Sequence, residues 1–230
     1  MSKVRASVLL AANMDGSQKL QPFVISKARS PHCFKNCKQL PIRYASNKAA
    51  WMTRQLFTEW LQAWDAELGK SGRHACLLVD NCSAHHTTCE LENIELKFLP
   101  PNTTARLQLL DQGIIKLFKV GYRRRLLDRL LRNLRVGTEL KVDLLGAIHM
   151  MTSAWNGMKK ETVANCFRKA GFVTAELSEA CEDGDDDDEC MGDTFRELSS
   201  LFPAAVPAGV SANDFANADT MLRASVTRIS

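Results

Sequence analysis

Two aspartates stand where acid-dependent chemistry is expected. Asp80 directly follows the apolar run at residues 75–79, which is typical of a buried strand. Ligand sites in α/β sheets form just beyond the carboxyl ends of strands, and a carboxylate is costly to bury there without a cation or a donor. From the sequence alone, Asp80 is either a site residue or a cap of the following turn.

Asp111 lies 31 positions after Asp80, within the sequence LLDQG at 109–113. An aspartate at the start of a helix is favoured as a cap, because it accepts hydrogen bonds from free backbone donors. Paired with Asp80, it is also a candidate ligand of a two-magnesium site, which needs hard oxygen ligands from several elements. Such a site needs a third carboxylate as well.

A strongly basic segment begins just after Asp111. Residues 116–135 hold eight basic side chains and one acid, Asp128, whereas the whole chain has a formal charge of only +4. We expect this segment to bind DNA phosphates without reading sequence. The alternative is the solvated face of an amphipathic helix whose other face, with Leu126 and Leu130, is core. The basic residues are Lys116, Lys119, Arg123, Arg124, Arg125, Arg129, Arg132 and Arg135.

These residues need an α/β scaffold to position them. Residues 6–12 and 20–25 are predicted to form a hairpin around the turn at 14–17, and 26–47 to be mostly loop. Thr53 is predicted to cap a helix that runs to Leu68, followed by strands at 75–79 and 94–99. Helices are expected at 110–134, 141–155 and 162–170. The core is predicted to include Trp51, Trp60, Trp64 and Trp155.

Composition limits the class of protein. The chain has 230 residues and 45% hydrophobic residues, which is enough for a real core. No apolar run is long enough to span a membrane, so we expect no membrane partner. We interpret the eight cysteines as free thiols in a reducing compartment. Cys33 and Cys37 could begin a zinc site, but no second Cys/His pair of matching spacing completes it. Residues 176–193 hold ten acids and no Lys or Arg, which predicts a disordered acidic tail over 173–230.

Several motifs occur in order along the chain, and together they resemble a known family. They are VLLAANMDG at 8–16, WMT at 51–53, VDNCSAH at 79–85, NIELKFLPPNTT at 93–104, LQLLDQGII at 107–115 and FKVGYRRRLL at 118–127. This sequence is similar to the DDE endonuclease domain of pogo/Tigger-type transposases, and to the jerky and centromere-binding-protein-B relatives derived from them. The likeness covers roughly residues 4–170, so residues 4–172 are expected to form one domain.

The resemblance implies a ribonuclease-H-like mixed sheet with flanking helices, and three acids that hold two Mg²⁺ ions. Asp80 corresponds to the second of these acids and Asp111 to the third. The first belongs on a strand preceding residues 8–12, which this chain begins too late to contain, so the sheet is expected to lack its first strand. Asn81, His85 and Gln112 occupy supporting positions, with Asn81 expected to position Asp80.

The function expected from the sequence is therefore DNA binding in the nucleus by a transposase-derived domain that does not cleave as written. Two alternatives stay open. The protein is an active Mg²⁺-dependent endonuclease if the first aspartate lies in a longer gene product. It is instead a non-catalytic interaction scaffold if the acidic segment recruits protein partners.

Overall fold

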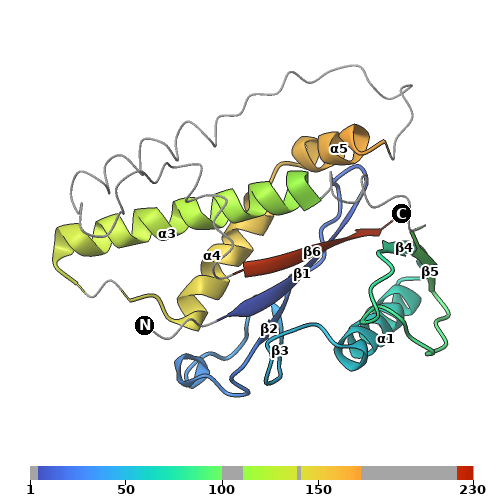
Figure 1. The fold of residues 1–230 in the computed structure, drawn as a ribbon, viewed down its shortest axis with the longest axis horizontal. Helices are drawn as coiled ribbons and strands as arrows, with labels where there is room; N and C mark the ends of the chain where they lie inside the picture. The colour runs from blue at the N-terminus through green and yellow to red at the C-terminus, as the bar shows by residue number, and fades with distance from the viewer. Residues whose placement is uncertain (1–4, 100–110, 139–140, 172–221, 230) are drawn as a thin grey trace.

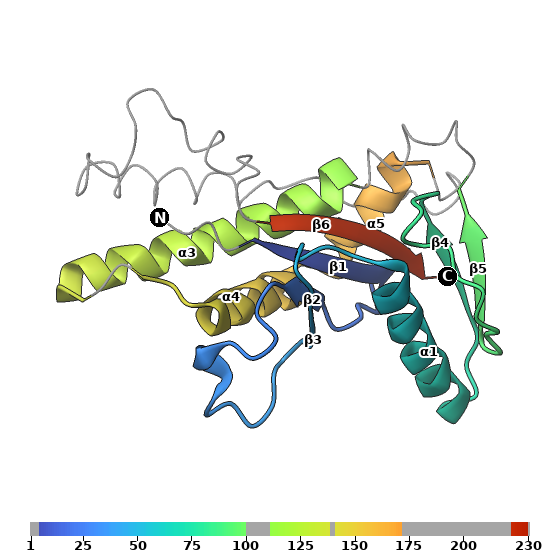
Figure 2. The ribbon, with the colours of Figure 1, turned by 60° about the horizontal axis from the view of Figure 1, so that its bottom comes forward.

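The computed structural model describes residues 5–99, 111–138, 141–171 and 222–229, which form one mixed sheet with helices on both faces (Figures 1 and 2). The predicted α/β class with a mixed sheet and flanking helices is confirmed. The strands are β1 (Ala6–Asn13), β2 (Phe23–Ser26), β3 (Arg43–Ser46), β4 (Ala75–Val79), β5 (Ile94–Phe98) and β6 (Leu222–Ile229). The helical elements are η1 (His32–Phe34), α1 (Arg54–Lys70), the π-helical turn η3 (Asp111–Ile115), α3 (Lys116–Val136), α4 (Leu144–Gly157) and α5 (Lys160–Lys169).

The strand order is β3-β2-β1-β6-β4-β5, so β6 lies in the interior of the sheet. It pairs in parallel with all eight residues of β1 and antiparallel with Leu77 and Leu78 of β4. In Figure 1, β6 lies directly beside β1, although more than 200 positions separate them in the sequence. The expected acidic tail over 173–230 therefore needs correction at 222–229, which form a strand. Residues 172–221 lie outside the described part of the chain.

The predicted β1–β2 hairpin is confirmed, and the sheet continues beyond it. β1 and β2 pair antiparallel, and Asp15 accepts hydrogen bonds from the backbone and hydroxyl of Ser17 in the turn between them. Residues 26–47 were predicted as loop, but Arg43–Ser46 forms β3, which pairs in parallel with β2. A four-residue strand between Pro41 and Asn47 is too short to show an alternating pattern.

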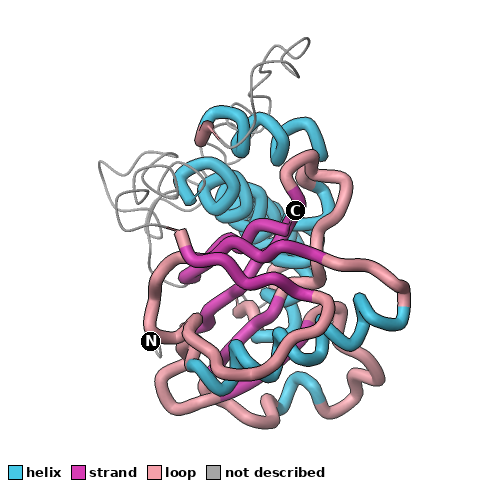
Figure 3. Tube along the Cα trace, turned by 90° about the vertical axis from the view of Figure 1, so that its right-hand side faces the viewer, coloured by secondary structure: helices cyan, strands magenta, loops and turns pink. Residues whose placement is uncertain are grey.

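The apolar core has two layers, one on each face of β1. Helix α1 packs its aromatic side against one face, where Phe57, Trp60 and Trp64 are at most 4% exposed. Helices α3, α4 and α5 cover the other face, around the fully buried Trp155. Figure 3 shows the strands side by side with helices around them. Trp51 is not core: it is 46% exposed, because it precedes the Thr53 cap and so lies outside the helix.

The predicted helices are confirmed, but their ends are shifted by a few residues. Thr53 caps α1 by accepting from the backbone N–H of Leu56, as expected. Leu127 and Leu131 are the buried leucines of α3, and not Leu130, because this helix is buried on more than one side. No helix in the described ranges is both long and apolar enough to cross a membrane.

Candidate acidic site and nucleic-acid interface

Asp80 immediately follows β4, and its carboxylate is held in place by His85. His85 Nδ1 lies 2.5 Å from Asp80 Oδ1, and the backbone N–H of Cys82 also donates to that oxygen. The hydrogen bond from His85 holds the pKa of the Asp80 carboxyl below its ordinary value, against the opposing effect of burial. The Asp80 side chain is 51% exposed, so the carboxylate remains open to solvent on one side.

His85 is buried, although it belongs to the loop that follows β4. It is 6% exposed, and its ring packs on Phe57 of α1 at 4.7 Å between centroids. Because the core fixes the ring, His85 fixes the Asp80 carboxylate in turn. The functional role of His85 as a supporting residue stays a prediction.

Asn81 contacts a different histidine from the one that holds Asp80. Its Oδ1 lies 2.9 Å from Nε2 of His86, and the His86 ring stacks on Phe98 at the end of β5. Asn81 was predicted to position Asp80, and the structure instead gives it His86 as partner. Phe98 is 39% exposed, and sequence reasoning assigned it no role.

Asp111 begins η3, so the prediction that a helical segment starts there is confirmed. Gln112 is its second residue. η3 contacts β6, which also pairs with the strand that ends beside Asp80. The two predicted acidic positions thus belong to elements that both adjoin β6.

No cluster of metal-ligating side chains surrounds Asp80 among the residues that the structure describes. Within the described ranges, no group of three His, Cys, Asp or Glu side chains is placed to share a metal ion. One oxygen of Asp80 is already engaged by His85. The sequence of β6, LRASVTRI, holds two arginines and no carboxylate. The predicted pair Asp80 and Asp111 therefore receives no third acid from the strand between their elements.

The basic residues of α3 differ in their exposure. Lys116, Arg132 and Arg135 are exposed, whereas Arg123 is only 8% exposed. The partly buried members are Lys119, Arg124, Arg125 and Arg129.

Two of the partly buried arginines pack toward α4. Arg125 donates to the carbonyl of Gly121 within its own helix, and its guanidinium lies close to Gly157. The guanidinium of Arg129 lies against Gly146 in the first turn of α4. The exposed cations, and not the whole predicted set, are therefore the ones most accessible to a polyanion.

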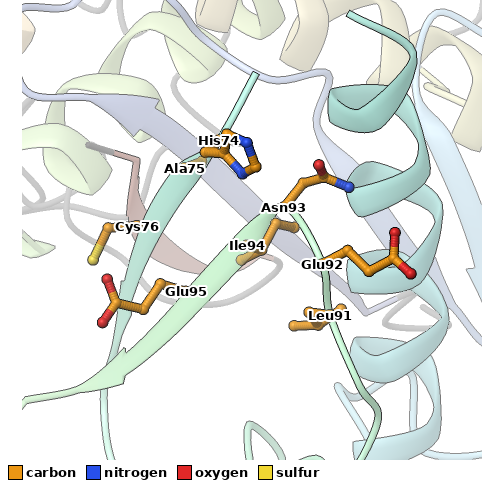
Figure 4. A pocket seen from close by; sticks show the side chains of 8 residues that line it. All are labelled: His74, Ala75, Cys76, Leu91, Glu92, Asn93, Ile94 and Glu95. Carbon is orange, nitrogen blue, oxygen red and sulfur yellow. The ribbon is translucent and has the colours of Figure 1, made fainter. Parts of the chain in front are cut away.

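A shallow hollow of about 460 Å³ lies at the other end of β4 and β5 from Asp80 (Figure 4). Its lining residues are His74, Ala75, Cys76, Leu91, Glu92, Asn93, Ile94 and Glu95. In Figure 4, Cys76 and Glu95 lie on neighbouring strands, as their register pairing requires. Sequence reasoning did not indicate this hollow, which has no part in the acidic site.

Comparison with known proteins identifies the family. The profile of the DDE superfamily endonuclease matches residues 3–167. Tigger transposable element-derived protein 4 of Mus musculus is 36% identical over 172 residues, which is 75% of this chain and 34% of that protein. Major centromere autoantigen B of Homo sapiens is 33% identical over 171 residues, 73% of this chain and 28% of that protein.

The Jerky protein of Mus musculus is 30% identical over 181 residues, 73% of this chain and 31% of that protein. The chain thus spans about a third of the length of these curated relatives. No solved structure matches it. The chain belongs to the DDE superfamily endonuclease family, among its pogo/Tigger-type members.

Proposed function

We propose that this chain is a DNA-binding domain, derived from a DDE transposase, that holds duplex DNA through α3 and does not cleave it. The observation that carries the proposal is the charge of α3, where eight basic residues accompany one acid over residues 116–135. Positively charged side chains along one helix repel each other, and a bound polyanion offsets that repulsion. Family membership indicates which polyanion to test first, since Tigger protein 4 is named for a transposable element.

The binding mode follows from the exposed cations. Lys116 lies at the start of α3, and Arg132 and Arg135 lie near its end. These positions cover all but the last of the 21 residues of the helix, about 30 Å at 1.5 Å per residue. Contacts spread over that length suit a phosphate backbone, and they give affinity without sequence specificity.

We propose that the chain does not cleave DNA because the strand next to β4 supplies no acid beside Asp80. A ribonuclease-H-like arrangement, which we propose for this sheet, would use a strand beside β4 to carry an acid opposite Asp80. In this chain that position holds β6, which has no Asp or Glu. Removing one ligand from a metal site weakens the charge stabilisation on which phosphoryl transfer depends. Asp80 and Asp111 are the residues that would hold magnesium, and we expect them to bind it weakly.

A nuclear location follows as part of the same proposal, because duplex DNA is the proposed partner. The three consecutive arginines at 123–125 also match the composition of a nuclear-import signal, but this support is weaker because Arg123 is buried. The acidic segment 176–193, proposed as a contact for protein partners, lies outside the described residues.

Two measurements test the proposal. Fluorescence anisotropy with random-sequence duplex DNA should give an affinity that falls steeply as salt rises. No binding at low salt, or binding insensitive to salt, would show that α3 does not hold phosphates.

A supercoiled-plasmid nicking assay with Mg²⁺ should show no nicked product. Nicking that Asp80→Ala abolishes, and that the matched surface variant Glu59→Ala retains, would instead establish an active endonuclease.

A further inference from the structure

We infer that the stacked rings of His86 and Phe98 form an aromatic platform on which an unpaired base of the bound DNA stacks. Phe98 ends β5, and His86 belongs to the loop that follows β4. This inference rests on the proposed function and refines it, because α3 is assigned the phosphates of the duplex and the platform is assigned a base outside the duplex.

The two rings of the platform are already stacked, and both remain exposed. Their centroids lie 4.7 Å apart, with 21° between the ring planes. Phe98 is 39% exposed even with His86 beside it, and His86 is exposed as well. Single exposed apolar side chains are common on protein surfaces, but a stacked pair offers a flat aromatic surface of the kind on which bases stack.

Both rings are held in place by neighbouring groups. Phe98 pairs with Val79 of β4, and the backbone N–H of Leu99 donates to the Val79 carbonyl. Nε2 of His86 lies 2.9 Å from Asn81 Oδ1, and the ring nitrogen is the donor because a carbonyl oxygen only accepts. A platform that is fixed in advance loses little side-chain freedom when a base stacks on it.

The register places the platform next to the candidate acidic site. Phe98 pairs with Val79, the residue that directly precedes Asp80. The loop after β4 then contributes two adjacent histidines with different surroundings. His85 is buried and holds the Asp80 carboxylate, whereas His86 is exposed and belongs to the platform. A DNA strand whose base stacks here therefore passes beside the Asp80 carboxylate.

The charges near the platform suit a nucleotide strand whose base, and not its phosphate, lies beside Asp80. The Thr58 hydroxyl of α1 donates to the hydroxyl of Thr87, the residue after His86. Arg54 lies four positions before Thr58, so it is on the same side of α1, and it is exposed. This cation attracts the phosphate of a neighbouring nucleotide, whereas the Asp80 carboxylate repels one.

The test compares three DNA probes by fluorescence anisotropy. The first is a blunt duplex, the second is the same duplex with a short single-stranded thymidine overhang, and the third carries abasic nucleotides in that overhang. The second and third probes have equal numbers of phosphates, so the contribution of α3 cancels in the ratio of their affinities. Wild type should bind the thymidine overhang at least about fivefold more tightly than the abasic overhang, which is the lower limit for one stacked base.

Two variants at the platform show whether its aromatic face causes this preference. Phe98→Leu keeps an apolar side chain but removes the ring, so the ratio should fall to about one. Phe98→Tyr keeps the ring and is the matched control, which should retain the wild-type ratio. Equal affinity of wild type for the two overhangs would overturn the inference, and so would a Phe98→Leu chain that keeps the wild-type ratio.

Failure of the proposed function gives a different result, namely no binding of the blunt duplex at low salt. The same ratio is then measured with single-stranded oligothymidylate and its abasic analogue. A preference for oligothymidylate that Phe98→Leu abolishes would support the platform without α3, and no binding of oligothymidylate would overturn it.

Crosslinking on the wild-type chain decides the question if Phe98→Leu does not fold. Iodouracil replaces thymine in the overhang, the complex is irradiated, and the crosslinked residue is identified by mass spectrometry. A crosslink at His86 or Phe98 would support the platform. Crosslinks confined to other residues, or none at all, would overturn it.

Discussion

Replacing Lys116, Arg132 and Arg135 by Gln removes the three exposed cations of α3 and leaves its buried side unchanged. If each contacts one phosphate, the slope of log affinity against log salt becomes shallower by about 0.9 per contact, or roughly 2.7 in all. Over a salt range of about 50 to 200 mM, the advantage of wild type over the variant should then shrink about 40-fold.

The assay is fluorescence anisotropy of a short random-sequence duplex over that salt range. The matched control neutralises three exposed lysines away from α3, namely Lys35, Lys38 and Lys70, and so makes the same change in net charge. If α3 carries the contacts, the control keeps nearly the wild-type slope. If both triple variants lose the same slope, the DNA responds to net charge alone, and the assignment of α3 as the contact surface is refuted.

Three further predictions concern the scaffold. Gly16→Ala should destabilise by at least about 2 kcal/mol in chemical denaturation, since Gly16 has φ +71° and an added Cβ would lie 2.3 Å from the Lys160 carbonyl oxygen; an unchanged midpoint would contradict this packing. Lys19→Met should cost about 1–3 kcal/mol, because the Lys19 ammonium donates to three carbonyls at the end of α4, and Lys19→Arg should recover part of the loss. Asp65 experiences a burial effect that raises its pKa, but hydrogen bonds from the backbone of Asn93 and its neighbours lower the pKa overall. The Asp65 carboxylate therefore contributes to stability above its unfolded pKa of about 3.9, and this contribution is lost as the pH falls through the lower folded pKa. The difference in unfolding free energy between wild type and Asp65→Asn should narrow below about pH 4. A difference independent of pH would refute the assignment.

Features with a local signal could be predicted from the sequence. The apolar run of β4 predicts a buried strand and the position of Asp80 at its end. Thr53 could be identified as a cap because it accepts a hydrogen bond from the backbone N–H of Leu56, only three positions further along the chain. These patterns depend on neighbouring residues, so one sequence is enough to read them.

Features that depend on distant partners could not be predicted. Leu222–Ile229 has only eight residues of mixed polarity, and its place in the sheet depends on β1 and β4. The burial of Leu127 and Leu131 was missed because one apolar stripe was assumed for α3, whereas this helix is buried on more than one side. The partner of Asn81 depends on how the loop after β4 folds back.

The place of β6 also affects how the chain reaches its native state. Val79 ends β4, and Leu222 begins β6, 143 positions later. At about 5–20 residues per second, a ribosome needs roughly 7–30 s to synthesise the intervening chain. During that time the facing edges of β1 and β4 lack the strand that pairs with them. Open strand edges promote aggregation, so yield during expression should depend on chaperones and temperature more than the native stability would suggest.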